Sequence, residues 1–75
     1  MNDRIVTNPE VLLGKPVIRG TRLFVDFIVG LLADNWSYEE VLKNYPGLVM
    51  EDILACLDYA AMVLKEERVI PMQHA

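Results

Sequence analysis

The spacing of hydrophobic residues changes near residue 25 and divides the chain into two parts. In the first part, short β-prone stretches alternate with turn-forming residues, and Gly14, Pro16 and Gly20 argue against a helix between residues 9 and 21. The pattern predicts short strands at residues 4–7, 16–19 and 21–25, with a turn at Gly20 between the last two. We therefore expect a hairpin or strand-like arm over residues 1–25.

In the second part, hydrophobic residues recur every three to four positions, which is the spacing of an amphipathic helix. The first helix is predicted over residues 26–34, with Asn35 placed to end it in the left-handed conformation. The second begins at a capping box of Ser37 and Glu40 and runs to residue 44. Tyr45-Pro46-Gly47 then breaks the chain before a long third helix over residues 50–67.

These elements predict a mostly α fold, in which a short N-terminal β-strand or hairpin arm precedes a three-helix bundle of the helix-turn-helix type. The 75 residues leave room for one domain, expected over residues 1–68, with the helices in residues 26–68. Residues 69–75 are expected to form a loose tail. The first and third helices carry more apolar surface than so small a bundle can cover, which predicts that this surface is buried in a twofold homodimer. Its expected interface residues are Leu54, Leu57, Ala61 and Leu64.

Composition favours a folded cytoplasmic protein. The chain is 53% hydrophobic with a net charge of −4, which excludes an intrinsically disordered chain. No apolar run approaches the roughly 18 residues that span a bilayer, and the N-terminus lacks the pattern of a signal peptide. A single cysteine excludes an internal disulfide framework and fits a reducing compartment.

Catalytic chemistry finds little support in the sequence. The one histidine, His74, lies one residue from the C-terminus, where nothing would orient it. Cys56 lies among apolar residues of the third helix and is expected to be a buried, inert thiol. One histidine and one cysteine do not make a metal site, and no glycine-rich phosphate loop is present. We therefore predict no enzymatic activity, no metal, no cofactor and no small-molecule substrate.

The third helix is also a poor reader of DNA. In a helix-turn-helix protein its first residues would enter the major groove, and here these are Met50, Glu51, Asp52 and Ala55. Phosphates would repel the two carboxylates, and no arginine or lysine lies between residues 44 and 64 to compensate. Glu51 and Asp52 instead suit the positive end of the helix dipole, and both are expected to be solvated.

The positive charge gathers in the N-terminal arm. Residues 1–25 contain four basic and two acidic residues, whereas residues 26–75 contain three basic and nine acidic residues. The candidate partner-binding residues are Lys15, Arg19, Gly20, Thr21 and Arg22, a turn with two arginines that suits a carboxylate or a phosphate. Three interpretations remain open: pairing with acidic helices of this chain or a second copy, binding an acidic surface of a partner protein, or binding nucleic acid.

One stretch of sequence carries a family resemblance. The string NPEVLLGKPVIRGTR at residues 8–22, followed by Ser37-x-x-Glu40, Tyr45-Pro46 and Glu51-Asp52-Ile53, closely resembles the prokaryotic domain-of-unknown-function family numbered 433. The resemblance extends over about residues 4–64. It implies a small homeodomain-like helical domain with an N-terminal strand region. Members are often encoded beside a PIN-like nuclease toxin, and the family has been proposed to supply the antitoxin.

Three positions depart from the family pattern. Leu13 stands where members commonly carry glycine, Phe24 where they carry proline, and Val49 where they carry threonine. Val49 cannot cap the third helix with a hydroxyl, which is expected to cost about 1 kcal/mol unless other contacts offset it.

The leading hypothesis is a dimeric, non-enzymatic antitoxin that neutralises a nuclease. In it, Arg19 or Arg22 enters the carboxylates of the nuclease site and displaces a metal ion. The alternatives are a DNA-binding repressor that uses the basic arm and an oligomerisation domain without a ligand.

Overall fold

The N-terminal arm is a two-stranded antiparallel sheet in the computed structural model, which describes residues 2–7, 10 and 14–66. Strand β1 (Ile5–Val6) pairs with β2 (Val17–Ile18), so that Ile5 lies opposite Ile18 and Val6 opposite Val17. The expected pairing of residues 16–19 with residues 21–25 is present in part, since the Ile18 amide donates to the Leu23 carbonyl and the Val25 amide to the Pro16 carbonyl, both at 3.0 Å. These bonds flank an isolated antiparallel bridge between Val17 and Phe24, and no longer strand forms there because α1 begins at residue 25.

Three helices follow, each within one residue of its expected bounds over the described part of the chain. They are α1 (Val25–Ala33), α2 (Tyr38–Asn44) and α3 (Met50–Glu66). Asn35 follows α1 with a φ of 72°, as predicted for a left-handed helix end. The capping box is confirmed, since the Ser37 hydroxyl accepts from the Glu40 amide at 3.0 Å and the Glu40 carboxylate from the Ser37 amide at 2.7 Å. The predicted tail over residues 69–75 lies outside the described residues.

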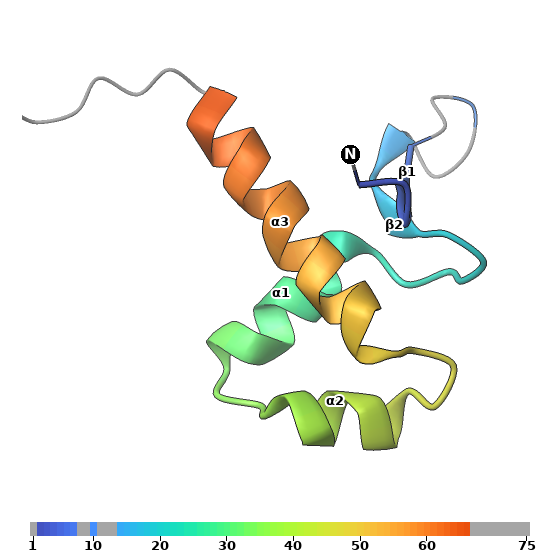
Figure 1. Cartoon of the computed structure of the whole chain (residues 1–75), viewed down its shortest axis with the longest axis vertical. Helices are drawn as coiled ribbons and strands as arrows, with labels where there is room; N and C mark the ends of the chain where they lie inside the picture. Colours follow the sequence, from blue (N-terminus) through green and yellow to red (C-terminus); the bar gives the residue numbers. More distant parts are fainter. Residues whose placement is uncertain (1, 8–9, 11–13, 67–75) are drawn as a thin grey trace, which may run out of the picture.

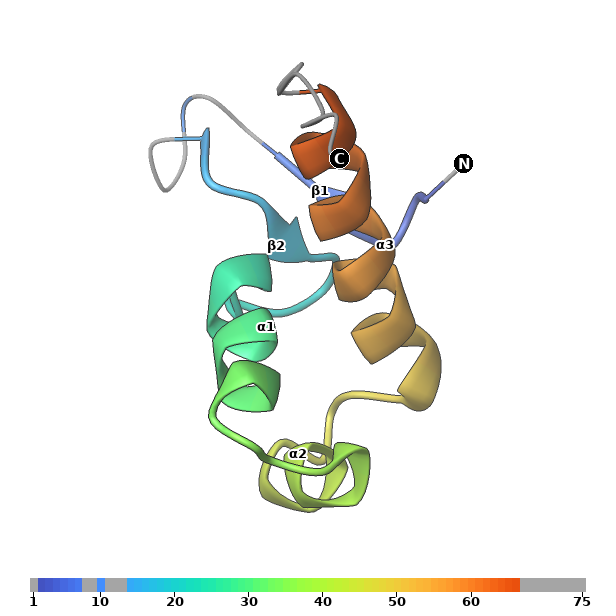
Figure 2. The ribbon, with the colours of Figure 1, turned by 90° about the vertical axis from the view of Figure 1, so that its left-hand side faces the viewer.

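The helices form one bundle with the arm against it. Helix α1 packs on α3, and α2 runs across the same end of both helices, while the last turns of α3 extend past α1 (Figures 1 and 2). The fully buried core side chains come from the arm and from all three helices: Ile18, Ile28, Val41, Ile53 and Cys56. Since Ile18 belongs to β2, the arm is part of the core and its position relative to the helices is fixed by packing. The mostly α, three-helix fold with an N-terminal hairpin is confirmed.

One buried carboxylate joins the arm to the start of α3. Asp52 is only 7% exposed, and its Oδ1 accepts from the Arg4 guanidinium at 2.9 Å. Its Oδ2 accepts from the amide of Val49, the residue before α3, at 3.0 Å. Asp52 therefore supplies half of a capping box where the family threonine is missing. The expectation of a solvated acidic pair holds for exposed Glu51 but is wrong for Asp52.

Candidate binding surface

Residues 19–22, here called the basic turn, are closed by backbone hydrogen bonds. The Ile18 amide donates to the Leu23 carbonyl and the Thr21 amide to the Ile18 carbonyl, both at 3.0 Å. The Thr21 hydroxyl donates to the Ile18 carbonyl at 2.8 Å and accepts from the Leu23 amide at 3.0 Å. Gly20 has a φ of +80°, a conformation that side chains other than glycine rarely adopt. Gly20 and Thr21 therefore shape the turn, and the two arginines at its ends are left for contact.

The structure separates the three candidate cations. Lys15 Nζ lies 2.9 Å from Asp26 Oδ2 at the start of α1 and 4.3 Å from the centre of the Phe24 ring. For Lys15, pairing with an acidic helix of the same chain is therefore the observed arrangement. Arg19 is exposed and uses its Nε to donate to the Asp3 carbonyl at 2.8 Å. Arg22 is exposed and has no hydrogen bond or ion pair within the part of the chain that the structure describes.

Sequence reasoning missed Arg4, which belongs to the same surface. The Arg19 amide donates to the Arg4 carbonyl at 2.7 Å, so the two residues continue the pairing of β1 and β2 by one position. The Arg4 side chain is 46% exposed and is held by Asp52. No local signal links Arg4 with a carboxylate 48 residues later, because the pairing depends on how the arm packs on α3.

We expect Gly20→Ala to lower the melting temperature by about 4–8 °C. A Cβ at Gly20 would meet no atom within 4 Å, so the loss arises from the positive φ alone, at a cost of about 1 kcal/mol. Gly47→Ala is the matched control, since that site is equally open and has no positive φ. Thermal unfolding followed by circular dichroism measures both. Equal melting temperatures for the two variants would contradict this prediction, because they would show that a side chain at position 20 tolerates the positive φ.

The expected interface residues of α3 lie mainly on its exposed side. Leu54 is 49% and Leu64 is 65% exposed, Ala61 is exposed, and Leu57 is half-buried. Their spacing of three, four and three residues places them on one line along the helix, here called the α3 seam. The core side of α3 carries the buried residues Ile53 and Cys56, and the seam borders this side because Leu57 lies one turn after Ile53. The helix thus has one apolar face in the core and a second one exposed.

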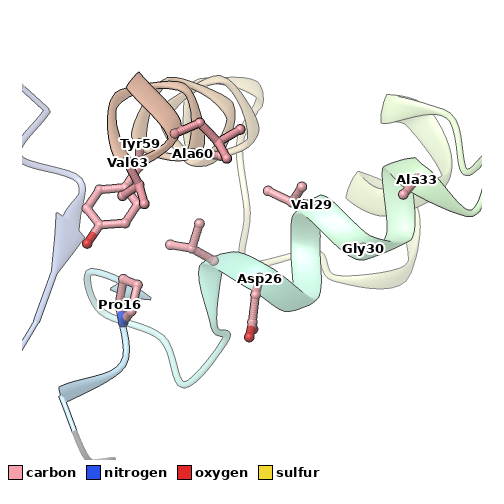
Figure 3. A pocket seen from close by; sticks show the side chains of 10 residues that line it. Pro16, Asp26, Val29, Gly30, Ala33, Tyr59, Ala60 and Val63 are labelled. Atoms are coloured by element: carbon pink, nitrogen blue, oxygen red, sulfur yellow. The ribbon is translucent and has the colours of Figure 1, made fainter. Parts of the chain in front are cut away.

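An open apolar groove lies between α1 and the C-terminal half of α3. Its volume is about 410 Å³. Figure 3 shows Tyr59, Ala60 and Val63 of α3 facing Val29 of α1, with Pro16 at one end. Gly30 has no side chain to fill the groove, and a Cβ at this position would meet no atom within 4 Å. The lining supplies almost no polar atoms to orient a small molecule, which makes the groove a poor substrate site.

The titratable residues of the described part of the chain include no cluster that could bind a metal ion and one residue with a strongly shifted pKa. Within residues 2–7, 10 and 14–66, no group of three or more histidine, cysteine, aspartate or glutamate side chains could hold a metal ion. Cys56 is fully buried, as expected, and burial raises its pKa to about 11, with a further contribution from the Asp52 carboxylate. A thiol with a raised pKa is a weak nucleophile at neutral pH. No described helix is long and apolar enough to cross a membrane.

Comparisons with known proteins agree with this fold. The chain is 36% identical over 56 residues to the uncharacterized protein y4eO of Sinorhizobium fredii, and the match covers 75% of this chain but 25% of that protein. It is 33% identical to a DUF433 member protein from Anabaena variabilis, whose crystal structure matches with a TM-score of 0.76 over 84% of this chain and 62% of the other. The chain thus spans only part of both relatives. Residues 5–60 match the family described as "Protein of unknown function (DUF433)". With more than half of its length matched in sequence and its fold shared with a solved member, the chain belongs to the DUF433 family.

Proposed function

We propose that this protein is a cytoplasmic, non-enzymatic binding module that acts as an antitoxin against a PIN-like nuclease encoded nearby. The class of partner comes from the family resemblance. The observation that supports a binding role is Arg22, an exposed arginine without a described partner at the end of a hydrogen-bonded turn. A rigid loop loses little conformational entropy on binding, so its arginine can contribute more of its contact energy to affinity.

Arg22 is the better candidate for the residue that enters the nuclease site. A metal-dependent nuclease holds its metal ion with carboxylates, and a guanidinium can bind a carboxylate through two parallel hydrogen bonds. Arg22 has its whole guanidinium available, whereas the Nε of Arg19 is already hydrogen-bonded to the arm. In the proposed complex, Arg22 occupies the place of the metal ion and Arg19 contacts the rim of the site.

DNA binding through α3 is the weaker alternative. Of the four α3 residues that would have to enter the major groove, Asp52 and Ala55 are buried and therefore cannot reach it. A repressor would have to use the basic turn, with Arg19 and Arg22 on phosphates. The two functions differ in salt dependence, because phosphate binding weakens steeply as salt rises.

We expect Arg22→Ala to weaken binding to the neighbour-encoded protein about 30-fold and Arg19→Ala to weaken it less. Truncating an arginine that is desolvated in an interface costs about 2 kcal/mol, whereas an exposed arginine contributes little to folding. Isothermal titration calorimetry with the two purified proteins measures the affinity, and thermal unfolding measures the stability of each variant. Lys43→Ala, which removes a cation from α2 at the far end of the bundle, should change neither (Figure 1).

Two outcomes would contradict the proposal. If the neighbour-encoded protein does not bind at all, while operator DNA binds with a steep salt dependence, the protein is a repressor. If Arg19→Ala and Arg22→Ala melt about 8 °C or more below the parent, the arginines are structural and the basic turn is not a binding site.

A further inference from the structure

We propose that two copies of this chain pair through the α3 seam in antiparallel orientation, with Glu51 of each copy beside Lys65 of the other. This inference is independent of the proposed function, because it concerns the protein alone. It depends on three features of α3: a second apolar face, the spacing of that face, and the charges beside it.

The first feature is exposure of large apolar side chains. Leu54 and Leu64 leave 49% and 65% of their surface in solvent, at the two ends of the seam. The last turns of α3 extend past α1 (Figures 1 and 2), while Leu57 packs against the core and Leu64 borders the groove beside α1. Covering such leucines contributes about 25 cal/mol for each Å² removed from water, and a twofold contact counts each leucine twice.

The second feature is the spacing. Seam residues follow the a and d positions of a heptad repeat, the pattern that packs one helix along another. In an antiparallel pair, a step of three residues up one helix is a step of three down the other. If Leu54 packs on Leu64 of the second copy, Leu57 therefore packs on Ala61 of that copy. Large residues then lie at the two ends, and each inner layer combines a large residue with a small one.

The third feature is charge and it sets the orientation. Glu51 and Lys65 lie on the same edge of the seam, two turns on either side of Asp58. Antiparallel pairing in this register brings Glu51 of one copy level with Lys65 of the other, and the twofold axis repeats this pair at both ends. The same register places Asp58 beside Asp58 of the second copy, so two opposite-charge pairs are set against one like-charge pair. A parallel pair would instead place this edge against the line of Ile53 and Ala60, which offers no opposite charge. Opposite charges thus favour the antiparallel arrangement.

The orientation and register can be tested by disulfide cross-linking. Leu54→Cys and Leu64→Cys proteins, mixed and oxidised, should form a covalent heterodimer, whereas Leu64→Cys alone should form little. Native Cys56 does not interfere, because it is fully buried. Efficient cross-linking of Leu54→Cys and of Leu64→Cys each with itself would overturn the antiparallel arrangement in favour of a parallel one.

A charge swap provides the second test. Glu51→Lys or Lys65→Glu alone should weaken dimerisation several-fold in sedimentation equilibrium, and the double variant should restore it. Both changes oppose the helix dipole, so recovery in the double variant cannot come from a more stable fold. Glu39→Lys, on exposed α2, is the matched control and should leave the dimer unchanged. A monomer at tens of micromolar, or a double variant as weak as the singles, would overturn the proposal.

Discussion

Asp52→Ala is expected to lower the melting temperature by about 10 °C or more, the largest loss of stability that a single polar residue of this protein should give. The carboxylate is 7% exposed and accepts hydrogen bonds from the Arg4 guanidinium and the Val49 amide. Alanine would leave the first orphan amide of α3 and the guanidinium without these contacts, at a cost of about 2 kcal/mol. In a domain this small, each kcal/mol lowers the melting temperature by about 4–8 °C.

Two variants distinguish this contact from a general charge effect. Glu51→Ala removes the neighbouring, exposed carboxylate from the same helix turn and should change the melting temperature by little. Arg4→Ala should be clearly destabilising, because it leaves a buried carboxylate without its cation. The double variant Arg4→Ala, Asp52→Ala should lose less than the sum of the two single losses. A melting temperature for Asp52→Ala within 2 °C of the parent would mean that the arm does not depend on this bridge.

The sequence predicted the helices of this fold better than the pairing of its strands. The helix bounds depend on signals within four residues, such as the Ser37 and Glu40 capping box and the positive φ of Asn35, and they were predicted correctly. The pairing of the arm depends on residues that are distant in sequence. The local partner of β2, residues 23–25, was expected and forms one bridge, whereas the pairing of β2 with β1 has no local signal and brings Ile5 into the core.

The candidate site was also predicted only where it depends on neighbouring residues in the sequence. A turn at Gly20 was predicted from local chemistry, and its positive φ confirms it. The different surroundings of Lys15 and Arg22 could not be predicted, since they depend on where α1 places Asp26. The groove beside Gly30 was missed for a similar reason, because a groove is a property of two packed helices and neither helix alone predicts it.

Cys56 is expected to react with iodoacetamide at pH 8 at least 100-fold more slowly in the folded protein than in urea. Its thiol is fully buried, and desolvation raises its pKa from 9.0 to about 11. Only the thiolate attacks the reagent, and two pKa units lower the thiolate fraction at pH 8 about 100-fold. Mass spectrometry of samples quenched over time gives both rates. A ratio below tenfold would show that the core around Cys56 opens readily.

The same shift predicts how stability depends on pH. The unfolded thiol ionises near pH 9, whereas the folded thiol stays protonated to about pH 11. Burial of the neutral thiol therefore contributes fully below pH 9, and this contribution is lost as the pH rises from 9 to 11. The measurement compares the parent with Cys56→Ala in urea at pH 8 and pH 10, so that contributions from other residues are common to both proteins. The parent should lose more stability than the variant over this interval, and equal losses would contradict a buried, neutral Cys56.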